Sequence, residues 1–259
     1  MIVLETKKLT RAYGGVVAVS EVDFQVKDGL ITGLIGPNGA GKTTLFNNMT
    51  GLDTPTSGQV FYNGEEITNK SAHRICRLGI ARTFQNIRLF KELSVLENVM
   101  VGLHFKTGKD PLKGRLKAAV DSYLHVRTEY DATHEKAMKW LEFFGLSEFA
   151  DELARNLPYG HQRELEIARA LATDPQILFL DEPAAGMNPS ETESLMNTIR
   201  RIRDLGVTVV LIEHDMKLVM NICDTITVLN YGRNIAQGTP EEIRNNEQVI
   251  EAYLGKEEE

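Results

Sequence analysis

The chain has 259 residues, of which 42% are hydrophobic and 25% are charged. A chain of this length buries enough surface to form a core without disulfides or structural metals. Its formal net charge of −7 weighs against a nucleic-acid-binding protein, because such proteins usually present a basic face to phosphates. No apolar run approaches the roughly 18 residues of a spanning helix, and no secretory signal opens the chain, so we expect a cytoplasmic protein that reaches a membrane only through partners.

The first part of the chain predicts strands and then a loop and a helix. Residues 17–26 alternate between apolar and polar positions, as a strand does. Residues 30–35 form a short apolar run that ends in a glycine-rich loop. Apolar residues follow at helical spacing, namely Leu45, Phe46, Met49 and Leu52. A strand, a glycine-rich loop and a helix in this order open an α/β unit.

The middle of the chain changes character between about residues 103 and 149. Charged amphipathic segments replace the apolar runs there, with Met138, Leu141, Phe144 and Leu146 as the apolar positions. We expect this region to form a helical lobe that is inserted between two halves of the α/β core.

The last part of the chain returns to strands. Residues 177–180, 207–212 and 225–229 are continuous apolar runs, which are typical of buried parallel strands. Tyr231 and Gly232 predict a hairpin turn. Residues 239–242, Thr-Pro-Glu-Glu, form a capping box with proline at the first helical position and predict the start of a C-terminal helix.

The glycine-rich loop carries the first chemical motif. Residues 36–43 read Gly-Pro-Asn-Gly-Ala-Gly-Lys-Thr and match the P-loop pattern. The glycines let backbone N–H groups crowd around phosphate oxygens, and the following helix adds partial positive charge. Lys42 would contact the β- and γ-phosphates, and the Thr43 hydroxyl would bind Mg²⁺. Since the loop lies between a buried strand and a helix, an incidental glycine-rich turn is a poor explanation.

Two carboxylates follow the apolar run at residues 177–180. Asp181, at the end of this predicted strand, would hold Mg²⁺ through water. Glu182 would polarise the water that attacks the γ-phosphate, as the corresponding residue does in analogous enzymes. The alternative is an acidic turn before Pro183, which the P-loop in the same chain makes the weaker interpretation.

Further motifs resemble those of the ATPases of ABC transporters across almost the whole chain. Residues 156–163, Asn-Leu-Pro-Tyr-Gly-His-Gln-Arg, resemble the signature motif of that family. The resemblance implies an ATP site formed by Tyr13, Val19, Gly36, Pro37, Asn38, Gly39, Ala40, Gly41, Lys42, Thr43, Thr44 and Gln85. It implies that Thr43, Gln85 and Asp181 hold the metal, and that Glu182 and His214 are catalytic. It also implies a D-loop at the dimer interface, formed by Gly186, Met187 and Asn188, and a signature that contacts the partner's ATP, formed by Pro158, Tyr159, Gly160 and His161.

Three of these residues have simpler interpretations when they are considered alone. Tyr13 could be a surface aromatic in a turn, Gln85 an ordinary polar surface residue, and His214 a structural histidine after an apolar strand. Only the family pattern favours contacts with the nucleotide for these positions.

The similarity is greatest to the ATPases of branched-chain amino-acid importers. It is carried by residues 181–189, 212–220 and 238–255 and by a lengthened segment at 103–135. It implies an ATP- and Mg²⁺-dependent subunit that energises uptake of leucine, isoleucine or valine. The implied partners are a second ABC ATPase subunit, two integral membrane permease subunits and, indirectly, a periplasmic substrate-binding protein. The implied location is peripheral, on the cytoplasmic face of the bacterial inner membrane.

The implied fold is an α/β ABC-type P-loop ATPase core with an N-terminal antiparallel β region and an inserted helical lobe. All 259 residues would form one ABC ATPase domain. The core would comprise about residues 1–90 and 165–259, and the lobe with its signature motif about residues 91–164.

The signature departs from the usual Leu-Ser-Gly-Gly-Gln form of the family. Pro158 stands in place of serine, Tyr159 in place of glycine and His161 in place of glutamine. Proline has neither a hydroxyl nor a backbone N–H to offer to a phosphate. We therefore expect a weaker ATP site wherever this signature completes one, and a heterodimer in preference to a homodimer.

Other functions share these motifs. An ATPase of a lipid or lipopolysaccharide exporter would carry most of them. A soluble ABC protein of translation or DNA repair usually has two fused cassettes or a long coiled coil, neither of which this sequence shows. A regulatory module that hydrolyses ATP poorly would fit Pro158, but Glu182 and His214 argue against it.

Overall fold

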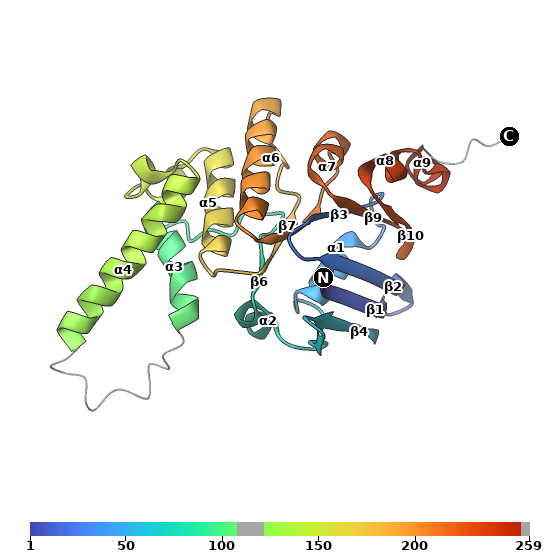
Figure 1. Cartoon of the computed structure of the whole chain (residues 1–259), viewed down its shortest axis with the longest axis horizontal. Coiled ribbons are helices and arrows are strands. Elements are labelled where there is room, and N and C mark those ends of the chain that lie inside the picture. The colour runs from blue at the N-terminus through green and yellow to red at the C-terminus, as the bar shows by residue number, and fades with distance from the viewer. Residues whose placement is uncertain (108–121, 255–259) are drawn as a thin grey trace. The chain divides into compact units, whose positions relative to one another are not determined.

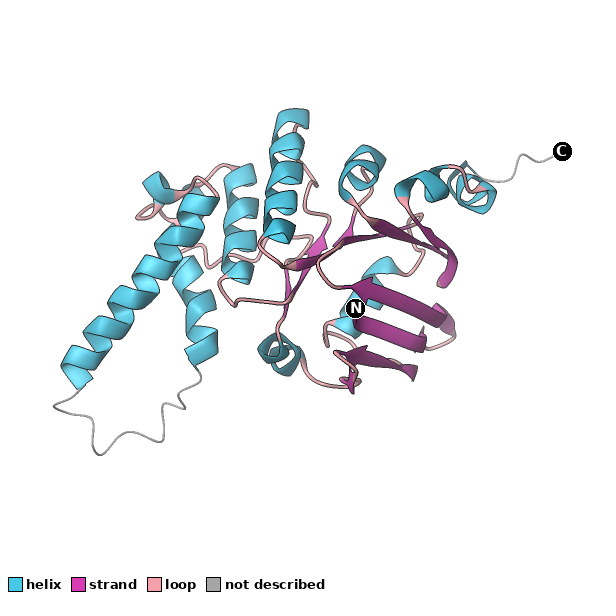
Figure 2. Ribbon diagram, viewed as in Figure 1, coloured by secondary structure: helices cyan, strands magenta, loops and turns pink. Residues whose placement is uncertain are grey.

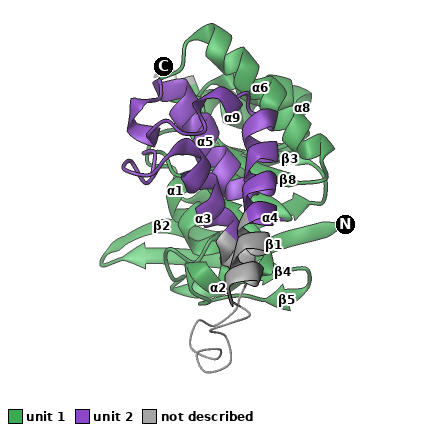
Figure 3. Ribbon diagram, turned by 90° about the vertical axis from the view of Figure 1, so that its left-hand side faces the viewer, with its two compact units in different colours: residues 1–85, 176–259 green, residues 86–175 purple. Residues whose placement is uncertain are grey.

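A computed structural model describes residues 1–107 and 122–254 of the chain. The chain divides into two compact units, one of residues 1–85 and 176–259 and the other of residues 86–175 (Figure 3). The boundaries predicted from the sequence lie near residues 90 and 165. Residues 108–121 of the lengthened segment and Gly255 of the C-terminal similarity lie outside the described part.

The first unit contains a six-stranded sheet with the strand order β10-β9-β3-β8-β7-β6 (Figures 1 and 2). Its strands are β3 (Ile31–Ile35), β6 (Ile80–Arg82), β7 (Ile177–Asp181), β8 (Thr208–Ile212), β9 (Thr225–Asn230) and β10 (Arg233–Gly238). All neighbours pair in parallel except β9 and β10, which form a hairpin. The three predicted buried strands and the turn at Tyr231 and Gly232 are confirmed.

A second sheet in the same unit is antiparallel, with the order β2-β1-β4-β5. Its strands are β1 (Ile2–Tyr13), β2 (Val16–Lys27), β4 (Ser57–Tyr62) and β5 (Glu65–Glu66). This sheet is the antiparallel β region that the family resemblance implied.

The helices of the first unit are α1 (Lys42–Met49), α2 (Ala72–Leu78), α6 (Pro189–Asp204), α7 (Met216–Ile222), α8 (Pro240–Arg244) and α9 (Glu247–Leu254). The capping box at α8 is confirmed, because the Thr239 hydroxyl accepts from Glu242 N–H and the Glu242 carboxylate accepts from Thr239 N–H. The expected helix after the P-loop is shorter than its apolar spacing suggested. It ends before Leu52, which is 46% exposed in the turn that leads to β4.

The core of this unit is shared by both sheets and by α1. Leu4 and Phe24 from the antiparallel sheet, Phe46 from α1, and Phe179 and Val210 from the parallel sheet belong to one cluster of fully buried side chains. The rings of Phe46 and Phe179 meet edge to face, with centroids 4.9 Å apart. This packing anchors α1, and with it the glycine-rich loop, to the strand that carries Asp181.

The second unit is helical, with α3 (Val95–Thr107), α4 (Ser122–Phe143), α5 (Tyr159–Leu171) and two short 3₁₀ turns, Ser147–Phe149 and Ala154–Asn156. Met138 and Leu141 lie in α4 as expected, whereas Phe144 and Leu146 lie just beyond its end, where both are buried. The predicted helical character is confirmed for the described residues of this region.

Candidate active site

The parallel sheet brings three sequence motifs to one edge. The strand order places β8 between β3 and β7, and the three strands run in the same direction. The P-loop follows β3, Asp181 ends β7, and Glu213 and His214 follow β8. The carboxyl edge of a parallel sheet is where ligands bind in open α/β folds.

The P-loop requires glycine at two positions because the backbone is crowded. Gly36 has φ +150°, and a Cβ added to it would lie 2.1 Å from the carbonyl oxygen of Leu229. Gly41, at φ +97°, would place a Cβ 2.4 Å from the carbonyl oxygen of Ala18. Gly41 is also the N-cap of α1 and makes no side-chain cap, so a phosphate can meet the first-turn N–H groups directly.

Lys42 lies under this loop with only 6% of its surface exposed. Its Nζ donates to the carbonyl oxygens of Gly36 at 2.8 Å and Pro37 at 3.0 Å. Burial lowers the pKa of Lys42, and the negative charges of Glu182 and Asp181 oppose that change. The cation is therefore held against the loop, close to both carboxylates.

Both oxygens of the Glu182 carboxylate are engaged. His214 Nε2 lies 2.7 Å from Oε1, and Gln85 Nε2 donates to Oε2 at 2.8 Å. An ionised carboxylate only accepts hydrogen bonds, so Nε2 of His214 carries the proton in such a pair. The structure thus brings together three of the residues predicted from the sequence, although 97 positions separate Gln85 from Glu182.

The backbone of Glu182 adopts a left-handed conformation, with φ +48°. A non-glycine residue in this region typically costs about 1–3 kcal/mol, and the surrounding structure must compensate for it. Glu182 N–H donates to the carbonyl oxygen of Ile212 at 3.0 Å, and its own carbonyl accepts from Ala185 N–H at 3.2 Å. The catalytic candidate therefore sits on a strained turn that is tied to the end of β8.

Arg82 is a member of this site that the sequence did not reveal. Its Nη2 donates to Asp181 Oδ2 at 2.7 Å, and both side chains are nearly buried, at 7% and 5% exposure. Its Nη1 donates to the side chains of Asn47 at 2.8 Å and Thr50 at 3.0 Å, at the end of α1. Nothing in the spacing of the sequence connects Arg82 with a carboxylate 99 positions away.

The oxygen donors at the site fit Mg²⁺. Asp181 supplies a carboxylate, Thr43 an exposed hydroxyl in the first turn of α1, and Gln85 a side-chain carbonyl. Mg²⁺ is commonly held by one or two protein oxygens together with substrate phosphates, and this set is of that kind. Arg82 donates to Oδ2 of Asp181 and so orients the carboxylate that would hold the metal.

Tyr13 and Val19 differ in how the structure presents them. Tyr13 is 46% exposed, and its hydroxyl donates to Asp53. The Arg11 guanidinium lies 4.5 Å from the centre of the Tyr13 ring. Val19 has no exposed surface and packs 3.3 Å from the position of a Cβ on Gly41, so it supports the loop from the core and is not open to a ligand.

The signature residues lie at the start of α5 in the helical unit. Pro158 is the N-cap and provides no side-chain cap, and α5 begins at Tyr159. The Tyr159 hydroxyl accepts from Arg163 at 3.1 Å, and the ring of His161 lies 5.3 Å from that of Phe149. The backbone N–H groups of Tyr159, Gly160 and His161 form the first helical turn, where an anion can be bound.

The expected D-loop leads into α6. Gly186 has φ +81°, and Asn188 is the N-cap of the helix. Asn188 Oδ1 accepts from Ser190 and Glu191 N–H, both at 3.0 Å, while Glu191 accepts from Asn188 N–H. The Asn188 side chain therefore has a structural task within its own chain.

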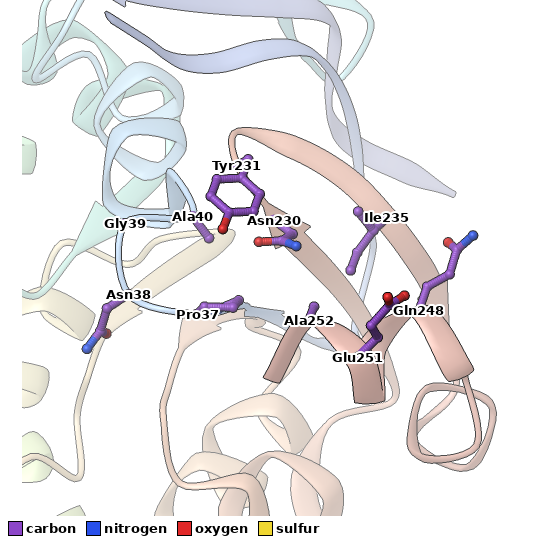
Figure 4. A pocket seen from close by; sticks show the side chains of 10 residues that line it. All are labelled: Pro37, Asn38, Gly39, Ala40, Asn230, Tyr231, Ile235, Gln248, Glu251 and Ala252. Atoms are coloured by element: carbon purple, nitrogen blue, oxygen red, sulfur yellow. The ribbon is translucent and has the colours of Figure 1, made fainter. Parts of the chain in front are cut away.

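A pocket of about 760 Å³ lies beside the P-loop (Figure 4). The P-loop lines one side, and the β9–β10 hairpin and α9 line the rest, through Pro37, Asn38, Gly39, Ala40, Asn230, Tyr231, Ile235, Gln248, Glu251 and Ala252. This set does not include Lys42, Asp181, Glu182 or His214. The pocket thus borders the candidate site without containing its chemical groups.

Comparison with known proteins identifies the family. The profile of a family described as "ABC transporter" matches residues 19–185, and one described as "Branched-chain amino acid ATP-binding cassette transporter" matches residues 233–259. The high-affinity branched-chain amino acid transport ATP-binding protein BraF of Pseudomonas aeruginosa is 49% identical over 255 residues, with 98% of each chain covered. The corresponding protein LivG of Escherichia coli is 46% identical over 254 residues, also with 98% of each covered.

Solved structures agree with this result. A nucleotide-free ATP-binding cassette from an ABC transporter superposes with a TM-score of 0.82 at 33% identity, covering 99% of this chain and 100% of the other. An ATP-binding cassette in its ADP conformation gives 0.83 at 32% identity, with the same coverage. The fold and the family resemblance expected from the motifs are confirmed: the chain belongs to the ABC transporter family, among the branched-chain amino acid transport ATP-binding proteins.

Proposed function

We propose that this chain is the ATP-binding and ATP-hydrolysing subunit of an importer for the branched-chain amino acids leucine, isoleucine and valine. One observation carries the hydrolytic part: His214 and Gln85 hold the Glu182 carboxylate at the sheet edge that also presents Lys42 and Asp181. The near full-length similarity to BraF and LivG supports the choice of transported substrate.

In this mechanism each side chain has a separate task. Lys42 neutralises charge on the β- and γ-phosphates, and the amides of the P-loop orient them. Glu182 accepts a proton from the attacking water, and His214 and Gln85 hold the carboxylate in place and meet the γ-phosphate. Thr43, Asp181 and Gln85 would hold Mg²⁺, which would supply further charge neutralisation at the phosphates. Tyr13 offers an exposed ring for stacking against adenine.

The partners follow from the same proposal. A second ABC ATPase subunit would bring its signature to this chain's P-loop and receive the Pro158–His161 signature at its own. Two permease subunits would hold the pair at the inner face of the bacterial inner membrane, and a periplasmic binding protein would deliver the amino acid. Within the described residues no helix is both long and apolar enough to cross a membrane.

The test is a complete transporter reconstituted in vesicles with Glu182→Gln in this chain. We expect ATP binding to persist and ATP turnover to fall by roughly 10²–10⁴, the usual effect of losing a general base. Uptake of radiolabelled leucine should fall with it. Turnover near that of the wild type would refute the role of Glu182, and wild-type vesicles that move lipid but no leucine would refute the importer.

A further inference from the structure

Glu213 is a buried carboxylate whose hydrogen bonds go to backbone amides of two different loops. It follows β8 directly and is 4% exposed. Its Oε1 accepts from Ala184 N–H at 2.8 Å, and its Oε2 accepts from His214 N–H at 3.0 Å and, at the limit of hydrogen bonding, from Asp215 N–H at 3.5 Å. Burial raises the pKa of Glu213, and these three hydrogen bonds act in the opposite direction.

The two loops are those that carry the catalytic pair. Ala184 lies two residues beyond Glu182, in the loop after β7, and His214 belongs to the loop after β8. The left-handed backbone of Glu182 needs support from outside its own turn, and the bond to Ala184 provides support on its far side. One carboxylate therefore fixes both the turn that aims Glu182 and the backbone of the histidine that meets it.

A buried glutamate at this position destabilises the fold unless its charged carboxylate accepts hydrogen bonds. A buried carboxylate loses its hydration, and hydrogen bonds from several N–H groups are what compensate for that loss. A bridge between the loops needs an acceptor on each oxygen, and only a carboxylate offers two equivalent ones. Glutamine offers a single oxygen and would turn its NH₂ group toward an N–H donor.

We propose that Glu213 is a positioning residue of ATP hydrolysis, which sets the approach of His214 to Glu182 by bridging the loops after β7 and β8. This inference rests on the proposed ATPase function. Glu213 contacts neither nucleotide nor water in this scheme and acts only through the catalytic pair.

The experiment measures ATP turnover and ATP binding in the reconstituted transporter for Glu213→Gln. Turnover should fall about 10- to 100-fold, the loss expected for one hydrogen bond to a charged group, while the Kd for ATP changes less than twofold. Glu242→Gln is the matched control, because Glu242 also accepts a backbone N–H, from Thr239, but is exposed at the start of α8. It should retain the wild-type turnover.

A double-mutant cycle separates positioning from general loss of structure. If Glu213 acts through the pair of Glu182 and His214, then the loss of turnover in Glu213→Gln combined with His214→Ala should be smaller than the product of the two single losses. Glu213→Ser, which removes the bridging side chain as well as its charge, should also lower turnover with unchanged ATP affinity, and it serves where the glutamine variant does not fold. Additive losses, unchanged turnover, or a parallel loss of ATP affinity would each overturn the inference. A wild-type transporter that hydrolyses no ATP would instead refute the proposed function itself.

Discussion

Nε2 of His214 lies 2.7 Å from Oε1 of Glu182, although the two residues come from loops after different strands. The neighbouring strands β7 and β8 pair in parallel, with Asp181 opposite Ile212, and this register brings the two loops together. Gln85 Nε2 donates a hydrogen bond to the other carboxylate oxygen of Glu182, Oε2. The carboxylate that is proposed to activate water is thus held on both sides by residues that are also proposed to meet the γ-phosphate.

Removing the histidine should leave Glu182 held by Gln85 alone. His214→Ala should lower ATP turnover in the reconstituted transporter by about 10- to 100-fold, which corresponds to one charge-assisted hydrogen bond. The Kd for ATP should change little, since Lys42 and the P-loop remain. His73→Ala is the control, because His73 is an exposed residue of α2. Unaltered turnover in His214→Ala would show that the contact has no catalytic role.

The buried pair of Arg82 and Asp181 should dominate the stability of the site. Arg82→Met leaves the Asp181 carboxylate without this partner in a nearly dry environment, which typically costs about 3–5 kcal/mol. Arg155→Met is the comparison, because the pair of Arg155 and Glu92 is exposed and such pairs contribute about 0–1 kcal/mol. Thermal unfolding of the two variants measures the difference. A similar decrease in Tm for both would contradict the assignment.

Asp53 should make the thermal stability of the protein decrease in acid. Burial acts to raise its pKa, but hydrogen bonds from Tyr13 and Thr54 N–H and the charge of Arg11 outweigh this, so the pKa lies below its ordinary value of 3.8. A carboxyl group whose pKa is lower in the folded state stabilises the fold at a pH above its pKa in the unfolded state. This stabilisation is lost as the pH falls through its pKa in the folded state. The Tm difference between wild type and Asp53→Asn should therefore be largest near neutral pH and shrink below pH 3.8. A Tm difference that stays constant down to pH 3 would argue against this role of Asp53.

Three motifs could be predicted because each depends on local sequence. The P-loop, the strand that ends in Asp181 and the α8 capping box are short patterns with a physical reason at every position. The partners of Arg82 and Glu213 could not be predicted, since their contacts depend on which strands become neighbours. The burial of Val19 and the early end of α1 before Leu52 also depend on packing, which overrides local periodicity.

The working dimer should be a heterodimer with unequal ATP sites. Pro158 caps α5 without a side-chain hydrogen bond, so this chain offers the partner's nucleotide no hydroxyl at that position. The missing charge-assisted bond corresponds to about 1.5–3 kcal/mol. A partner with an intact serine would complete the stronger site on this chain's P-loop. Lys42→Ala should then abolish more ATPase activity than the matching P-loop change in the partner.

Two further results bear on this prediction. Pro158→Ser in this chain should raise the turnover that remains in the Lys42→Ala background, because it restores a donor to the partner's site. Equal losses from the two P-loop variants, or full activity of a transporter with this chain as its sole ATPase, would contradict the unequal model.

The pairing of β6 with β7 has an evolutionary consequence. Ile80 and Ile177 are neighbours across these strands, and Gln176 N–H donates to the carbonyl oxygen of Gly79 at 2.8 Å. The chain therefore leaves the sheet for residues 86–175 and returns to it at adjacent strands. An inserted segment whose two ends lie on neighbouring strands can lengthen, shorten or be replaced without altering the strand register that positions Asp181. Residues 86–175 can thus diverge in length and sequence while the strand ends that carry Asp181 and Glu213 keep their places in the sheet.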